Sequence, residues 1–166
     1  MELQKRKSNR LVNYDYDSAG AYFITICTRD KKCILSQIVG DDALGVPKNQ
    51  LTKIGMVVEA YILSGNKMNR VTVEKYVIMP NHIHVLLLVD MDECGTPRAS
   101  SPTMAVVPRF VSALKRLVNQ KIGQDIFQRS YHDHIIRGRQ DYLKIWEYID
   151  NNPQKWSLDC FYREEA

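Results

Sequence analysis

The sequence predicts a single α+β domain in which helices cover an antiparallel sheet. Short runs of β-branched and aromatic residues alternate with longer segments whose apolar residues recur every three or four positions. The predicted elements follow the order ββαββαβα, and helices interleaved with strand pairs indicate a ferredoxin-like plan. The length of 166 residues and the hydrophobic content of 45% suit one domain over positions 1–166.

The first predicted strand follows an N-terminal basic arm, residues 1–13. The run AYFITICT at 21–28 is β-branched and aromatic, a composition typical of strands. Residues 29–32 predict a turn, and residues 33–39 predict a strand that returns to form a hairpin with the first. The glycines, aspartates and proline of residues 40–47 predict a loop.

The middle of the chain predicts one helix and a second pair of strands. Apolar residues at helical spacing extend from about 52 to 63, and Gly65 is a suitable stop. Residues 71–79 and 82–89 predict two strands joined by a tight turn at Pro80. The second of these strands is apolar on both faces beyond its first residues, so we expect it to be central and buried on both sides.

The C-terminal half predicts a crossover, two helices and one strand. Residues 90–102 contain Gly, Pro and Ser and predict a flexible crossover loop. A helix from about 103 to 122 carries an apolar stripe. A strand is predicted over 127–136, and a last helix extends from about 140 to 151, where Pro153 ends it.

Composition argues against several classes of protein. No stretch approaches the roughly 18 consecutive apolar residues that a membrane span needs. The basic N-terminus has no apolar run behind it, unlike a signal peptide. The four cysteines are scattered without a CxxC pair, which indicates reduced thiols more than a zinc knot. We expect a cytoplasmic protein without a membrane partner.

A net charge of +4 permits a nucleic-acid partner without requiring one. Basic residues cluster in the N-terminal arm and on the predicted helix from about 103 to 122, although solvated faces explain such clusters equally well. On that helix Arg109, Lys115 and Arg116 lie on or beside the polar face, which is a candidate surface for a phosphate backbone. Arg137 is a further candidate DNA contact.

The first candidate site is the sequence PNHIHVL at positions 80–86. Strand side chains two apart point to the same face, so His82 and His84 lie together and Ile83 points to the opposite layer. Two neutral imidazoles at this separation can bind one metal ion at about 2.0–2.2 Å. Taken alone, two neighbouring surface histidines are the commoner explanation of an H-x-H pair.

The second candidate site is the sequence YLKIWEYIDNNP at positions 142–153. Tyr148 is rotated by roughly 110° from the centre of the helix's apolar stripe, at about 100° per residue, and so lies at the edge of the buried face. Asn152 is four residues on and shares its side of the helix. Taken alone, these residues also fit a rim tyrosine and a C-terminal capping asparagine.

Together the two segments form a chemically consistent site. Two imidazoles and an amide oxygen are three neutral ligands, which leave a divalent cation with its full charge and open positions. An anionic phosphodiester would satisfy both, and the cation would polarise the phosphorus for attack. Tyrosine is a poor nucleophile at its usual pKa of about 10. A cation that stabilises the transition state and the phenolate compensates for this.

These segments resemble a known family. PNHIH at 80–84, followed by aliphatic residues, resembles the histidine–hydrophobe–histidine (HUH) motif of single-tyrosine transposases. YIDNNP at 148–153 resembles their tyrosine-helix motif, and its Asn–Pro ending is similar to that of the REP-associated tyrosine transposases. YFITIC at 22–27, YHDHIIR at 131–137 and Trp146 are also similar to this subgroup, so the resemblance covers nearly the whole chain.

The resemblance implies an endonuclease that cuts and rejoins single-stranded DNA beside a hairpin. The tyrosine becomes joined to the 5′ phosphate and a free 3′ hydroxyl remains. Carried over by motif, Tyr148 is the nucleophile, and His82, His84 and Asn152 hold magnesium or manganese. Many insertion-sequence members have glutamine where Asn152 stands. Some members are homodimers that exchange the tyrosine helix, so Tyr148 is expected to act in its own chain or on a partner's histidines.

Two other functions fit parts of the pattern. A non-catalytic single-stranded nucleic-acid-binding domain should expose aromatic residues on adjacent central strands, and the strand 82–89 offers only histidine and aliphatic residues. A metal-dependent phosphodiesterase that uses water would leave the tyrosine helix without a purpose. His132 and His134 share a face of a predicted strand and are expected to lie outside the metal site. Asp133 is expected to pair with Arg129 or Arg137.

Overall fold

The computed structural model describes residues 18–40, 47–91 and 105–162. The predicted basic arm, and the predicted crossover loop beyond its first two residues, lie outside these ranges. The strands and helices are β1 (Gly20–Cys27), β2 (Ser36–Val39), β3 (Lys48–Leu51), α1 (Lys53–Ser64), β4 (Val71–Ile78), β5 (His82–Val89), α2 (Val106–Ile122), β6 (His132–Ile136) and α3 (Arg139–Asn151). Three 3-10 helices are η1 (Arg29–Lys31), η2 (Gly65–Lys67) and η3 (Pro153–Leu158).

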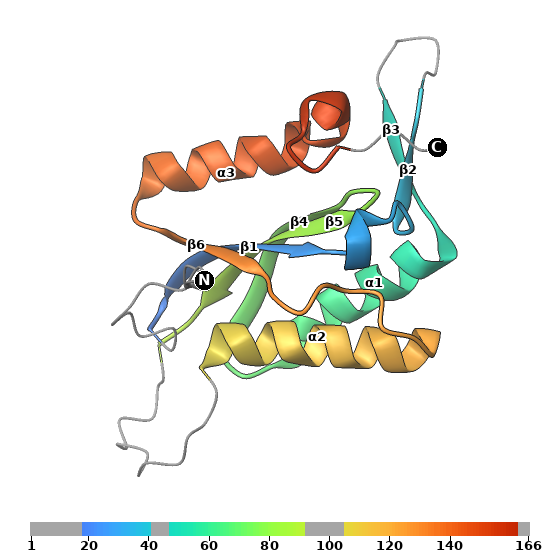
Figure 1. The fold of residues 1–166 in the computed structure, drawn as a ribbon. Coiled ribbons are helices and arrows are strands. Elements are labelled where there is room, and N and C mark those ends of the chain that lie inside the picture. The colour runs from blue at the N-terminus through green and yellow to red at the C-terminus, as the bar shows by residue number, and fades with distance from the viewer. Residues whose placement is uncertain (1–17, 41–46, 92–104, 163–166) are drawn as a thin grey trace, which may run out of the picture.

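A four-stranded antiparallel sheet in the order β4-β5-β1-β6 is the centre of the fold (Figure 1). β5 and β1 are its inner strands, and β5 is buried over nearly its whole length. The prediction of a central strand over 82–89 is therefore confirmed. The α+β class with helices packed on an antiparallel sheet is confirmed as well.

Helices cover both faces of this sheet (Figure 1), with α1 and α2 on one side and α3 on the other. The first side holds the main core, in which α1 and α2 pack against alternate residues of the inner strands: Tyr22, Ile24, Ile26, Ile83, Val85 and Leu87. The α3 side holds a smaller cluster that contains Leu86, Ile145 and Ile149. Because strand side chains alternate, the even-numbered positions of β5 face α3.

The predicted hairpin between residues 21–28 and 33–39 is wrong. β2 pairs instead with β3, a strand that the sequence analysis did not predict, in a separate two-stranded ribbon. After β1 the chain runs to the end of β4, where the backbone N–H of Leu35 donates to the carbonyl of Pro80 and the hydroxyl of Ser36 donates to that of Ile78. Both edges of β1 are paired, with β5 and with β6, so β1 has no edge left for β2.

The predicted strand over 127–136 is shorter in the structure. β6 covers only its last five residues, and Phe127 makes an isolated bridge with Thr28. The side-chain amine of Lys115 donates to the carbonyls of Gln128, Arg129 and Ser130 at 2.8 Å, 3.3 Å and 2.9 Å. These carbonyls are therefore turned toward α2 and are not available for a strand ladder.

The three helices agree with their predicted positions to within about three residues. α1 begins after Thr52, whose hydroxyl accepts a hydrogen bond from the N–H of Gly55 at 3.0 Å. α2 ends at Gly123, which takes a left-handed conformation with φ 82°. α3 ends where Pro153 follows Asn152. Within the described ranges, no helix combines the length and apolar character needed to cross a membrane.

Candidate active site

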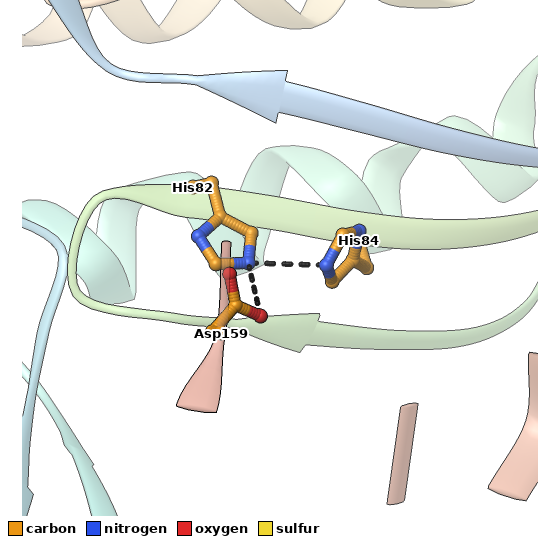
Figure 2. Close-up of side chains that lie close together, drawn as sticks. All are labelled: His82, His84 and Asp159. Carbon is orange, nitrogen blue, oxygen red and sulfur yellow. Dashed lines mark hydrogen bonds and ion pairs between the residues drawn. The ribbon is translucent and has the colours of Figure 1, made fainter. Parts of the chain in front are cut away.

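His82 and His84 lie at the start of β5 with their rings side by side on the α3 face of the sheet (Figure 2). Their Nε2 atoms are 3.0 Å apart, and both residues are almost fully buried. The structure thus brings together the two imidazoles that the alternation of strand side chains predicted. Two imidazole nitrogens that converge in this way are arranged as ligands of one ion.

Partly buried aromatic side chains lie against the two rings. Phe23 stacks on His84 with ring centroids 4.9 Å apart, and Phe161 lies 4.8 Å from His82. Burial lowers the pKa of His82 to about 4 and outweighs the carboxylate of Asp159, which raises it. Burial also lowers the pKa of His84 well below its usual value, helped by the neighbouring His82. Both imidazoles are therefore neutral at pH 7, as metal binding requires.

Tyr148 of α3 reaches the histidines of its own chain. Its hydroxyl lies 3.3 Å from Nε2 of His84 and 3.4 Å from a carboxylate oxygen of Asp159. The residue is still 42% exposed, so one side of the phenol is open. Burial, followed by the negative charge of Asp159, raises the pKa of Tyr148 to about 12. The free phenol is therefore a weaker nucleophile than an ordinary tyrosine until a cation stabilises its anion.

Asn152 lies next to Asp159 and has a side-chain oxygen without a hydrogen-bond partner among the described residues. It is the first residue after α3 and is only 3% exposed. Its side-chain nitrogen donates to Asp159 at 3.4 Å, whereas its Oδ1 atom has no hydrogen-bond partner among the described residues. A buried carbonyl oxygen without a partner is costly, and a cation would satisfy it.

Asp159 is a site residue that the sequence analysis missed. Its carboxylate lies 3.9 Å from Nε2 of His82, as Figure 2 shows, and its side chain is only 4% exposed. The ligand atoms of His82, His84 and Asp159 all lie within 4.8 Å of one another. No spacing rule pointed to this residue, because η3 turns the chain back toward the sheet after the predicted helix has ended.

The donor set fits a divalent cation, although it differs from the expected set of three neutral ligands. Two imidazole nitrogens and a carboxylate oxygen converge, and the side chain of Asn152, which contacts that carboxylate, adds an unpaired amide oxygen, so the set carries one negative charge. Carboxylate and carbonyl oxygens are preferred by magnesium and manganese, and imidazole suits the later transition metals. The residues present are therefore compatible with the magnesium or manganese that the resemblance implies.

Comparisons with known proteins bear on the family and the fold. No protein-family model matches the chain. A protein of Haemophilus influenzae described as uncharacterized is 33% identical over 177 aligned positions, which cover 96% of this chain and 94% of that protein. The two proteins belong to one family. A solved structure of a REP-associated tyrosine transposase bound to a REP hairpin is similar with a TM-score of 0.61 and 18% identity, over 88% of this chain and 73% of the other.

The fold is that of a single-tyrosine transposase. In this transposase fold the proposed nucleophile and the two histidines come from α3 and β5, which are far apart in the sequence and meet on one face of the sheet. A pocket of about 530 Å³ opens beside Tyr148, and Lys144 and Lys155 are among its lining residues.

The predicted DNA contacts are not gathered at this site. Arg109, Lys115 and Arg116 belong to α2, which covers the other face of the sheet from Tyr148 (Figure 1). Lys115 is bound to three backbone carbonyls, and burial lowers its pKa to about 8. The Nε atom of Arg109 is buried without a partner among the described residues. Arg116 and Arg137 have exposed side chains.

The histidines of β6 are not part of the cluster of His82, His84 and Asp159. Nε2 of His134 is 2.8 Å from a carboxylate oxygen of Asp141, and both His132 and His134 are exposed. The expected ion pair of Asp133 with Arg129 or Arg137 is not found among the described residues, where Oδ1 of Asp133 is buried without a hydrogen-bond partner. Asp133 pairs with Ile24 and therefore faces α1 and α2, whereas His132 and His134 face the opposite side of the sheet.

Proposed function

We propose that the protein is a transposase that cuts and rejoins single-stranded DNA beside a hairpin through a covalent link to Tyr148. The single observation that carries the proposal is the 3.3 Å distance between the Tyr148 hydroxyl and Nε2 of His84. A nucleophile is thereby in contact with a metal-ligand cluster. The similarity in fold to a REP-associated transposase bound to a REP hairpin supports a DNA hairpin as the substrate.

We assign magnesium or manganese to His82, His84, Asn152 and the added ligand Asp159. The support is the convergence of the donor atoms of His82, His84 and Asp159 and the unpaired Oδ1 of Asn152. Bound there, the metal would polarise the scissile phosphate and stabilise the phenolate. Because Tyr148 reaches His84 within one chain, this assignment does not depend on exchange of the tyrosine helix in a homodimer.

The chain's own residues then account for the transfer. The phenolic oxygen of Tyr148 attacks the phosphorus, a P–O bond to tyrosine forms, and the bond from phosphorus to the 3′ oxygen breaks. The phenol loses its proton to solvent at the exposed side of the residue, and the leaving 3′ oxygen takes up a proton. The product is a 5′-phosphotyrosine with a free 3′ hydroxyl. Attack by a 3′ hydroxyl on this link rejoins DNA and releases Tyr148.

We assign the contacts to DNA to basic side chains on both faces of the sheet. Arg116 and Arg137 are exposed, and both are proposed to contact phosphates. Arg109 and Lys115 are proposed with them, although the Lys115 amine must first release its carbonyl partners or act through the segment it holds. Lys144 and Lys155 line the pocket beside Tyr148 and are suited to the strand that enters it.

The test is an adduct assay with a hairpin-bearing single strand and manganese. Wild-type protein should form a covalent protein–DNA product, and Tyr148→Phe should reduce its yield by at least about 10³-fold, since the nucleophile is lost. Tyr142→Phe is the matched control, because Tyr142 lies on the same helix six residues before the nucleophile and its hydroxyl donates to Glu74 of β4.

The alternative functions give different results in the same assay. Cleavage without an adduct, unchanged in Tyr148→Phe, would replace the proposal with a water-dependent phosphodiesterase. Binding without cleavage at any metal concentration would indicate a non-catalytic nucleic-acid-binding domain. An adduct that persists in Tyr148→Phe and disappears in Tyr142→Phe would move the nucleophile to Tyr142.

A further inference from the structure

The two imidazoles of the metal centre have their far nitrogens, Nδ1, held by different kinds of partner. Nδ1 of His82 lies 2.9 Å from Oδ1 of Asn81, and Nδ1 of His84 lies 2.8 Å from the hydroxyl of Thr25. All four side chains are buried. An amide oxygen only accepts a hydrogen bond, whereas a hydroxyl both donates and accepts. The two partners therefore impose different conditions on their rings.

The orientation of the Asn81 amide follows from its other contacts. Its side-chain nitrogen donates to the carbonyl of Phe161 at 2.8 Å and to that of Lys31 at 3.3 Å. Both carbonyls can only accept, so the NH₂ group faces them and Oδ1 faces His82. Nδ1 of His82 is therefore the protonated nitrogen. In the neutral ring, Nε2 of His82 carries the lone pair.

His84 must have the opposite tautomer in the absence of metal. Its Nε2 atom lies 3.0 Å from Nε2 of His82, and the Tyr148 hydroxyl, 3.3 Å away, directs its own proton to Asp159. Because Nε2 of His82 is an acceptor, the contact between the two rings is a hydrogen bond only when Nε2 of His84 carries the proton. Nδ1 of His84 then accepts the hydroxyl proton of Thr25 at 2.8 Å. Burial lowers the pKa of both imidazoles, which agrees with this uncharged network.

A cation between the rings needs the lone pairs of both Nε2 atoms. We propose that Asn81 holds His82 in its metal-binding tautomer permanently, whereas Thr25 allows His84 to change tautomer when the metal binds. The proton of His84 moves from Nε2 to Nδ1 of the same ring by exchange with water, and the Thr25 hydroxyl rotates from donor to acceptor. The histidines release no proton. Asn81 and Thr25 are thus positioning residues, and this inference rests on the proposed metal site.

Nuclear magnetic resonance of protein labelled with ¹⁵N-histidine tests the tautomers directly, because the nitrogen shifts report which ring nitrogen is protonated. In EDTA, we expect the Nδ1–H form for His82 and the Nε2–H form for His84. Saturating Mg²⁺ should leave His82 unchanged and convert His84 to Nδ1–H. If the metal binds and His84 keeps one tautomer throughout, the inference is wrong while the proposed function stands. Failure of Mg²⁺ and Mn²⁺ to bind would contradict both.

Variants of Thr25 test the same point through metal affinity, measured by titration with Mn²⁺ alone. Thr25→Val keeps the shape but leaves the Nδ1–H of metal-bound His84 without an acceptor, and a loss of about 10–100-fold is expected. Thr25→Ser should restore most of the affinity. Ser36→Ala is the control, since this buried hydroxyl donates to the carbonyl of Ile78 and contacts no imidazole. An equal loss in Ser36→Ala, or no rescue by serine at position 25, would contradict the role of Thr25.

Discussion

The two faces of the central sheet are built from the same strands and bury different kinds of side chain. On the face covered by α1 and α2, β1 and β5 present residues such as Ile24 and Val85, which are fully buried among other apolar groups. On the face under α3, the same strands present Thr25, His82 and His84, which are equally buried and polar. The alternation of strand side chains makes this division possible.

The difference indicates that one face mainly stabilises the fold, whereas the other holds the proposed active site. Burial of polar groups costs free energy unless they are hydrogen-bonded, and the α3 face leaves the Asn152 oxygen unpaired. Burial of apolar groups on the opposite face offsets this cost at about 25 cal/mol per Å². Three experiments, taken from the largest expected effect to the smallest, test this division.

The largest effect is expected from the core under α1 and α2. Phe110 is 1% exposed, and its ring fills the space beside Gly65, so Phe110→Ala should lower the free energy of unfolding by about 3–5 kcal/mol in urea denaturation. Phe23 lies on the α3 face and is only partly buried, so Phe23→Ala should lower the free energy of unfolding by less than half as much. Equal losses for the two substitutions would show that stability is not concentrated on one face.

The second effect is a loss of stability in acid that belongs to the α3 face. The pKa of His82 is about 4 in the fold, below the usual 6.5, so the unfolded chain takes up a proton first as the pH falls. Stability is complete above pH 6.5 and decreases between pH 6.5 and 4. For metal-free protein this residue alone should lower the free energy of unfolding by about 2 kcal/mol from pH 7.5 to pH 5.0.

Comparison of pH slopes isolates this contribution. Urea unfolding of wild type and of His82→Gln, both in EDTA, should show the shallower pH dependence in the variant. The exposed His132 and His134 are common to both proteins and cancel. Parallel slopes would mean that His82 is not buried in its neutral form.

The smallest of the three effects concerns the missed ligand. Asp159→Asn keeps an oxygen for the backbone N–H of Phe161, which is 2.7 Å from the present carboxylate, and removes the negative charge. The affinity for Mn²⁺ should fall at least about tenfold, equivalent to about 1.4 kcal/mol, since this cation prefers carboxylate oxygens. The free energy of unfolding without metal should change by less than about 1 kcal/mol. Unchanged affinity would remove Asp159 from the metal site.

Much of the fold was predictable because it depends on local periodicity. The strand His82–Val89 has the predicted bounds, and the three helices lie where apolar residues recur at helical spacing. The hairpin between residues 21–28 and 33–39 was predicted wrongly, since sequence proximity favours a hairpin whereas the two edges of β1 are paired with β5 and β6, strands much farther along the chain. β3 is four residues long and too short to show a period.

The sequence alone determined which side chains share a face: His82 with His84 by the strand period of two, and Tyr148 with Asn152 by the helical separation of four. Only the tertiary structure decided that β5 and α3 bring these pairs together, and that Asp159, Thr25 and Asn81 join them. The repeat of a strand or a helix sets which face of that element each side chain points to. Contact between elements depends on which faces bury the most apolar surface together, and that is a property of the whole chain.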